Sequence, residues 1–219
     1  MTDFIQRLVM YIPQLRHGAM VTLTLCVAGM AIGFVLAVLL CQLSQSRHKS
    51  LQAFCSVYCS FFRGTPLLAQ LLLCFYLPTA LGLDIPGSMA AIIVLAMNTS
   101  AYQSQILRSG FDAIPAGQLE AAAIFGISRV RTLCRIQLPQ VLRLTLSALV
   151  SELIDVIKVS AVVSVVSVTD LMRVGQQLVS QTYRPLEVYL VTAVFYLLLT
   201  SVLSMAASLL EKRWKERYQ

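Results

Sequence analysis

Charged residues are scarce in this chain of 219 residues. Asp, Glu, Lys and Arg make up 12% of it, whereas they make up about a quarter of a soluble domain. Apolar residues account for 58%, and the mean hydropathy is +0.76. This balance excludes an ordinary soluble domain, and it predicts an integral membrane protein.

Histidine is also rare, and this limits the chemistry that the chain can perform. The two histidines, His17 and His48, are remote in sequence from the six cysteines, which lie almost all inside apolar runs: Cys26, Cys41, Cys55, Cys59, Cys74 and Cys134. We therefore interpret the cysteines as small hydrophobic side chains and expect neither a disulfide framework nor a metal site. No nucleophile with a suitably placed base is evident, so we expect no catalytic residues and no enzyme.

Three further absences bear on organisation. There is no Gly-x-x-x-x-Gly-Lys phosphate loop, so ATP would have to be hydrolysed by a separate chain. No Pro-, Gly- or Ser-rich linker and no charge block divides the sequence, so we expect one domain over residues 1–219. The first apolar run begins near Met20 without a convincing cleavage site before it, and we expect it to be retained.

Five apolar segments are predicted to cross the membrane as helices. They are residues 20–40, a stretch within 51–83, and residues 89–107, 141–168 and 188–210. The first segment would span about 31 Å at ~1.5 Å per residue, which matches one hydrocarbon core. The second is too long for one perpendicular span and is interrupted by Arg63, Gly64 and Pro66, so its first part can lie along the interface.

The distribution of Lys and Arg predicts the orientation. Twelve of them fall on one side of the five predicted spans and four on the other. The twelve are Arg47, Lys49, Arg63, Arg108, Arg129, Arg131, Arg135, Arg143, Lys212, Arg213, Lys215 and Arg217; the four are Arg7, Arg16, Arg173 and Arg184. The positive-inside rule then places the C-terminus in the cytoplasm and the N-terminus outside. The net charge of +7 thus reflects topology rather than nucleic-acid binding.

The loop between the third and fourth predicted spans is unusually polar and reads LEAAAIFGISRVRTLCRIQLPQ. Pro115 can occupy a first helical turn, Ala121 to Ala123 continue that helix, and Gly126 can end it in the left-handed conformation. Ser128 can cap a second helix, which Pro139 limits. Taken alone, the pattern predicts two short helices joined by a glycine, and it also fits a solvated loop with ordinary caps.

The full spacing of this loop resembles the EAA signature of ABC importer permeases. Glu-Ala-Ala at 120–122 is followed by Gly126, Ile136 and Leu138-Pro139. FFRGTPLLAQLLLCFYLP and NTSAYQSQILRSGFDAIPAGQLEAA are similar to segments of the histidine, glutamine and arginine permease family, and the resemblance covers nearly the whole chain.

This resemblance implies an all-α permease of the type I (MetI-like) ABC importer fold with five transmembrane helices. It also implies that residues 110–140 form a coupling helix that seats in a groove of a cytoplasmic ATPase. The residues expected to take part are Glu120, Ala121, Ala122, Phe125, Gly126, Leu138 and Pro139.

The resemblance implies partners as well. They are a cytoplasmic ABC ATPase dimer, a second permease subunit (identical or paralogous) and an extracytoplasmic amino acid-binding protein, all at a bacterial cytoplasmic membrane. ATP and Mg would be bound by the ATPase, so this chain would hold no cofactor. The implied function is translocation of a polar amino acid.

Three charges lie within seven residues of the fourth predicted span: Glu152, Asp155 and Lys158. Each would cost roughly 2.5–3.5 kcal/mol at the bilayer centre, so they must pair or face water. Asp155 and Lys158 are three residues apart and can form an ion pair on one helix. Lys158 is roughly 240° around the helix from Glu152, which leaves Glu152 as the freer carboxylate.

The role of Glu152 follows from the resemblance. In that family the fourth helix lines the translocation path, and members with a carboxylate at this position include carriers of cationic amino acids. We therefore expect Glu152, together with Asp155, to receive the side chain of arginine, lysine, histidine or ornithine. The chain departs from the family at Ser151, at residues 159–161 and at Gln105, which weakens the transfer of substrate identity.

Other polar groups in the predicted spans allow two interpretations. Asn98 and Gln105 are candidates for the substrate path, but they can equally form hydrogen bonds between helices. The run Arg63, Gly64, Thr65 and Pro66 is interpreted as a structural anchor and kink. An ion-coupled secondary transporter is the alternative function, although the paired halves with broken helices that are typical of such folds are not evident.

Overall fold

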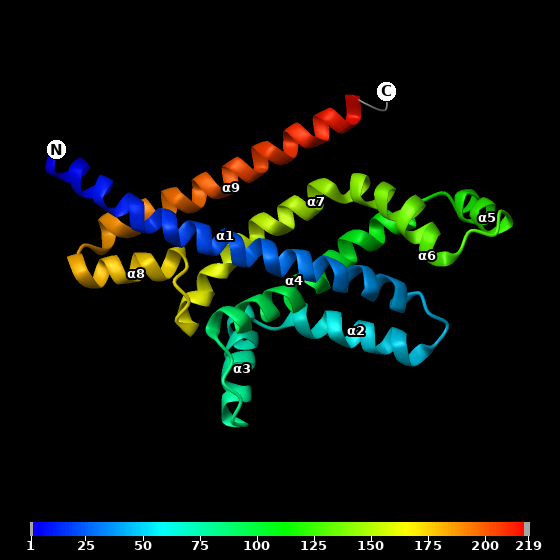
Figure 1. Ribbon diagram of the computed structural model, residues 1–219, viewed down its shortest axis with the longest axis horizontal. Helices are drawn as coiled ribbons and strands as arrows, with labels where there is room; N and C mark the ends of the chain where they lie inside the picture. The colour runs from blue at the N-terminus through cyan, green and yellow to red at the C-terminus, as the bar shows by residue number, and fades with distance from the viewer. Residues whose placement is uncertain (1, 217–219) are drawn as a thin grey trace.

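The computed structural model describes the backbone of residues 2–216 and the side chains of residues 9–212. Within this range every regular element is helical, which confirms the all-α prediction (Figure 1). The elements are α1 (Thr2–Ser44), α2 (Lys49–Gly64), α3 (Leu67–Ala80), α4 (Gly87–Asp112), α5 (Ala116–Ile124), α6 (Arg129–Thr132), the π-helical η1 (Leu133–Gln137), α7 (Leu138–Val159), the 3-10 helical η2 (Ser160–Val166), α8 (Leu171–Thr182) and α9 (Pro185–Glu216). The side chains of Arg7, Arg213, Lys215 and Arg217 lie outside the described residues.

Helix α1 begins well before the predicted start at Met20. Its first turns carry polar residues, but Tyr11, Leu15 and Ala19 recur on one face and pack against α8 and α9. Hydropathy averaged along a window misses such a helix because the polar face dilutes the apolar one. The N-terminal lead is therefore part of the bundle.

Close packing of α1 against α4 forms the centre of the bundle (Figure 1). Small residues make this approach possible. A Cβ atom added at Gly33 would lie 2.6 Å from Cγ2 of Thr99 and 2.9 Å from the carbonyl oxygen of Ala96. Such close contact between helix backbones is typical of membrane bundles, where packing rather than hydrophobic burial drives helix association. On another side, α4 packs against α7.

The interruption predicted between residues 63 and 66 is a sharp break. The α2 and α3 axes meet at 106°, and Thr65 has the extended backbone that a following proline imposes (φ −115°, ψ 149°). Helix α2, whose Cys55 and Phe62 are buried, packs along α1 and α4, whereas α3 turns away from it (Figure 1). The part that was expected at the interface thus contributes to the bundle.

The fourth predicted span is shorter than expected. It was predicted to extend to Val168, but α7 ends at Val159 and is followed by the 3-10 segment η2. The hydroxyls of Ser160 and Ser164 bond to backbone carbonyls three residues earlier, which competes with the α-helical pattern. Ser167 then adopts a left-handed conformation with φ 61°.

A short helix that was not predicted, α8, lies between α7 and α9. Asp170 caps it, because its carboxylate accepts hydrogen bonds from the backbone N–H groups of Met172 and Arg173. Leu171, Val174 and Leu178 form its buried face. Its polar face hides it from a search for apolar runs.

Two helices in the described range are long and apolar enough to cross a membrane: Val9–Ser44 and Pro185–Lys212. The bent pair α2–α3 would count as a third. Helices α4 and α7 have sufficient length, 26 and 22 residues, but they carry polar and charged side chains. The five crossings and the orientation therefore stay predictions.

Candidate functional site

The first candidate site is the α5–α6 segment, which projects from one end of the bundle (Figure 1). Pro115 directly precedes α5 as its N-cap residue. Gly126 has φ +66° and ends the helix in the left-handed conformation, as predicted. The N–H groups of Gly126 and Ile127 bond to the carbonyls of Ala123 and Ala122. This paired arrangement is a Schellman motif, which aims the next residues away from the helix axis.

Apolar side chains on this segment are uncovered. Ile124 is 84% exposed, Phe125 82% and Val130 70%. Glu120 and Ala121 are also exposed, whereas Ala122 is buried. A cluster of exposed large apolar side chains is typical of a protein–protein interface.

The helix after Ser128 corrects one prediction. Ser128 occupies the N-cap position without a side-chain hydrogen bond. Pro139 was expected to limit the second helix, but α6 continues through η1 directly into α7, and Pro139 lies in the first turn of α7. The wide π turn, in which the Leu138 N–H bonds to the Leu133 carbonyl, accommodates the proline ring. Residues 129–159, from α6 through η1 to α7, therefore form one continuous helical rod.

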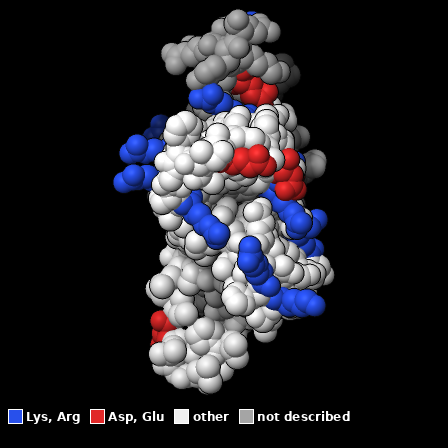
Figure 2. Space-filling model, turned by 90° about the vertical axis from the view of Figure 1, so that its right-hand side faces the viewer, with Lys and Arg blue, Asp and Glu red and all other residues white. Residues whose placement is uncertain are grey.

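Positive charge gathers at the same end of the molecule. Figure 2 views this end and shows more Lys and Arg than Asp and Glu side chains on its surface. Arg47, Lys49, Arg108, Arg129 and Arg131 are all exposed. The exposed apolar segment and the basic residues that predict the cytoplasmic side thus lie together.

The second candidate site surrounds Glu152, which is half-buried on α7. Its Oε1 accepts a hydrogen bond of 2.9 Å from the hydroxyl of Thr99 on α4. The Thr99 oxygen accepts a hydrogen bond of 3.2 Å from Gln103 Nε2, which also donates to the Met30 carbonyl on α1. Because Gln103 donates its hydrogen bond to the Thr99 oxygen, the single hydroxyl proton of Thr99 remains free to be donated to Glu152. The chain of bonds crosses three helices.

Sequence reasoning missed Thr99 and Gln103, and a signal for both was present. They are four residues apart, on the face of α4 that also carries Ala96 and meets Gly33. Both side chains are fully buried. A polar pair at that spacing on a small-residue face indicates contact with a neighbouring helix.

The predicted ion pair between Asp155 and Lys158 is confirmed, with 2.7 Å between Oδ1 and Nζ. Both side chains are more than half exposed on this subunit, at 66% and 57%. Glu152 instead bonds to Thr99. The three charges thus divide into an inward carboxylate and an outward pair.

Asn98 and Gln105 have different environments. Asn98 donates to the Phe62 carbonyl and to Gln70 Oε1, at 2.9 and 3.0 Å, and Gln70 in turn donates to the Thr65 hydroxyl. Asn98 therefore ties α4 to the break between α2 and α3. Gln105 is exposed and lines a cavity.

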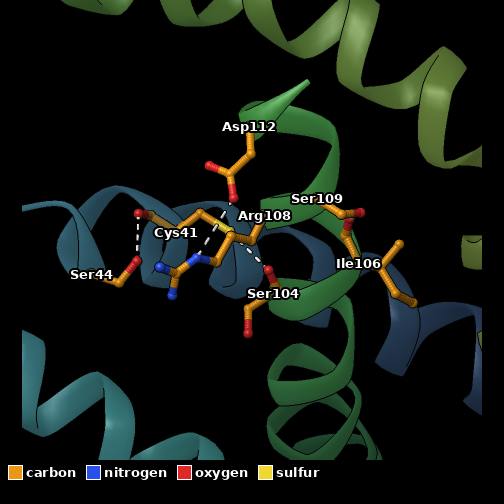
Figure 3. Close-up of polar contacts among 7 residues, drawn as sticks. All are labelled: Cys41, Ser44, Ser104, Ile106, Arg108, Ser109 and Asp112. Carbon is orange, nitrogen blue, oxygen red and sulfur yellow. Dashed lines mark hydrogen bonds and ion pairs between the residues drawn. The ribbon is translucent and has the colours of Figure 1, made fainter. Parts of the chain in front are cut away.

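That cavity, of about 650 Å³, lies among the end of α1, helix α2 and helix α4. The Arg63 guanidinium, also on its wall, lies 5.4 Å from the centre of the Tyr102 ring. Figure 3 shows the opposite end, where Arg108 Nε is 3.9 Å from Asp112 Oδ2 and the Cys41 thiol donates to the Ser104 carbonyl. Further polar lining residues include Gln52, Ser56 and Ser60. The cavity is thus lined by polar side chains together with apolar ones such as Leu40 and Cys55.

The cysteines are all unpaired thiols. Cys26, Cys41 and Cys55 are buried, which fits their interpretation as small hydrophobic side chains, whereas Cys134 is exposed.

Comparison with known proteins places these features in context. Residues 29–216 match the family described as "Binding-protein-dependent transport system inner membrane component". The arginine transport system permease protein ArtQ of Bacillus subtilis is 34% identical over 205 residues, covering 93% of this chain and 94% of that protein. The nopaline transport system permease protein NocM of Agrobacterium fabrum is 32% identical over 217 residues, covering 94% and 90%.

Solved structures of ABC transporters resemble the fold of this chain. A chain of "an amino acid ABC transporter with histidines" superposes with a TM-score of 0.84 at 36% identity, covering 96% of this chain and 98% of that chain. A chain of the inward-facing MetNI methionine ABC transporter superposes with a TM-score of 0.75 at 22% identity, covering 91% and 95%, and at that identity the likeness concerns the fold alone.

Proposed function

Because this chain belongs to the family of binding-protein-dependent transport system inner membrane components, we propose that it is the permease subunit of an ABC importer for a polar, basic amino acid. As a member of that family it is a transport component and not an enzyme. The proposed partners are an ATPase dimer that binds ATP and Mg, a second permease subunit and an extracytoplasmic amino acid-binding protein. The proposed location is the bacterial cytoplasmic membrane, crossed several times.

The exposed apolar segment around Phe125 carries the proposal of coupling to an ATPase. Ile124 and Phe125 are more than four-fifths exposed, and they flank the left-handed Gly126. A groove on a partner protein would bury them. Because α6, η1 and α7 are continuous, a movement imposed on α6, which follows the turn at Gly126, would reach the helix that carries Glu152.

The orientation is part of the proposal. The basic residues at the α5–α6 end favour the cytoplasm for that end, where an ATPase would be found. Helices α4 and α7 would then cross the membrane with their polar faces turned inward, since Gln103 donates to Thr99 and Thr99 donates to Glu152. Together with α1, the bent pair α2–α3 and α9, these two helices would make five crossings. An odd number of crossings with a cytoplasmic C-terminus would leave the N-terminus outside.

The Glu152 geometry supports a basic substrate. Of its carboxylate oxygens only Oε1 has a hydrogen bond within the described residues, which leaves Oε2 able to accept one from a ligand. A carboxylate in a membrane helix is costly unless it is paired, and a cationic substrate would supply the missing charge. The named relatives include an arginine permease. The family match does not favour the alternative of an ion-coupled secondary transporter.

Reconstitution tests this function directly. The chain would be purified with its genomically adjacent ATPase and binding protein, reconstituted in lipid, and assayed for ATP hydrolysis with each amino acid in turn. We expect arginine, lysine, ornithine or histidine to stimulate hydrolysis. Stimulation by neutral amino acids alone would refute the basic substrate, and no stimulation by any amino acid would refute the importer.

Thr99→Val is expected to weaken transport without preventing assembly. Valine matches the shape of threonine but removes the hydroxyl that orients Glu152. Because a hydrogen bond to a charged group contributes about 1.5–3 kcal/mol, we expect the half-saturating concentration of arginine to increase by about 10- to 100-fold. Thr99→Ser, which keeps the hydroxyl, serves as the control. Equal uptake kinetics for the two variants would show that Thr99 does not orient Glu152.

A further inference from the structure

A second cavity, of about 790 Å³, lies between the end of α1 and the α5–α6 segment. Arg47 and His48, from the loop after α1, lie on one wall, and Arg129 of α6 lies on the other. Among the described residues that line it, none is Asp or Glu. A site with fixed positive charge and no carboxylate favours an anion.

The other residues that line this cavity are of two kinds, polar and apolar. Gln45, Ser46, Thr132 and other side chains of amide or hydroxyl type can donate hydrogen bonds. Leu43, Leu119 and Ile127 add an apolar part. Two guanidinium groups suit a phosphate, because each presents several N–H donors in a planar array. The combination fits a phosphate that is attached to an apolar body.

The position of the cavity indicates where such a ligand would come from. Its lining residues come from the end of α1, a helix that is long and apolar enough to cross a membrane, and from the α5–α6 segment, and Figure 2 shows that this end of the molecule is basic. Residues there would lie at the level of the lipid headgroups. Basic pockets beside membrane helices on the cytoplasmic side bind anionic headgroups.

We propose that this cavity binds the phosphate headgroup of an anionic phospholipid from the cytoplasmic leaflet, with Arg47 and Arg129 as its main contacts. The location in that leaflet rests on the orientation in the proposed function. A headgroup held by both arginines would bridge α1 and the exposed segment that we assign to ATPase coupling. Coupled transport would then depend on the lipid composition.

The test uses the complete complex in lipid nanodiscs or detergent and compares two double variants. Arg47→Gln with Arg129→Gln removes both proposed contacts. Lys49→Gln with Arg131→Gln removes the same charge from positions two residues away that do not line the cavity. Native mass spectrometry would measure bound dioleoyl phosphatidylglycerol against dioleoyl phosphatidylcholine.

We expect wild type and the control to retain phosphatidylglycerol in preference to phosphatidylcholine, and the Arg47/Arg129 variant to bind it about 30-fold more weakly, from the contribution of two arginines at a membrane surface. In nanodiscs without phosphatidylglycerol, amino acid-stimulated hydrolysis by wild type should fall to the level of that variant. Equal phosphatidylglycerol binding by the two double variants would overturn the proposal. The proposal would also be overturned if the cavity bound inorganic phosphate but showed no preference for phosphatidylglycerol, because the ligand would then be a soluble anion. Lipid binding is read without transport, so an inactive complex would count against the proposed function and not against this site.

Discussion

Glu152→Gln is expected to lower the uptake of arginine or lysine by on the order of 100-fold, because losing one member of a close charge pair costs about 2–5 kcal/mol. Glutamine keeps the size of the side chain and can still accept the hydrogen bond from Thr99. The packing of α7 against α4 should therefore persist. What is lost is the negative charge that would balance a cationic substrate in a region of low dielectric constant.

The measurement is uptake of radiolabelled arginine by proteoliposomes that contain the whole complex. Glu211→Gln makes the same chemical change at the end of α9, remote in sequence from the Thr99–Glu152 contact, and should leave uptake unchanged. Size-exclusion chromatography of the complex would confirm assembly of both variants. Undiminished uptake by Glu152→Gln would exclude Glu152 from the substrate path.

Gly126→Val is expected to uncouple ATP hydrolysis from uptake, with transport reduced at least about tenfold. The left-handed φ of +66° is strained for a β-branched residue by about 1–3 kcal/mol. Relief of that strain would break the hydrogen bonds of Gly126 and Ile127 to α5 and would redirect Phe125. An ATPase groove that depends on this arrangement would then lose its contact.

Gly117→Val provides the matched control, because Gly117 lies in α5, the helix that Gly126 ends. Gly117 has no positive φ, and an added Cβ there meets nothing within 4 Å, so coupling should persist. Glu120→Arg tests the same surface without altering the backbone, because Glu120 is exposed. The readouts are amino acid-stimulated hydrolysis, uptake and co-purification of the ATPase. If Gly126→Val and Glu120→Arg both retained full coupling, the coupling role of α5 would be refuted.

Several features were predictable from the sequence because they depend on local chemistry. The scarcity of charge identifies the membrane class, and the break at Pro66 follows from the geometry of the residue before a proline. Gly126 ends α5 because glycine adopts positive φ at little cost. The Asp155–Lys158 pair follows from spacing on one helix. The family could be predicted because the spacing of the Glu-Ala-Ala loop matches a known signature.

Other features depend on which helix faces meet, and a single helix pattern does not contain that information. Asn98 and Thr99 are neighbours in sequence, yet Asn98 bonds to the α2–α3 break and Thr99 bonds to Glu152 on α7. The same holds for the cavity between the end of α1 and the α5–α6 segment. The sequence by itself determined the class of this protein, its family and the turn at Gly126 that ends α5. Only the tertiary structure decided that Glu152 is oriented by Thr99 and Gln103, because helices far apart in the chain must pack in one register before those side chains can meet.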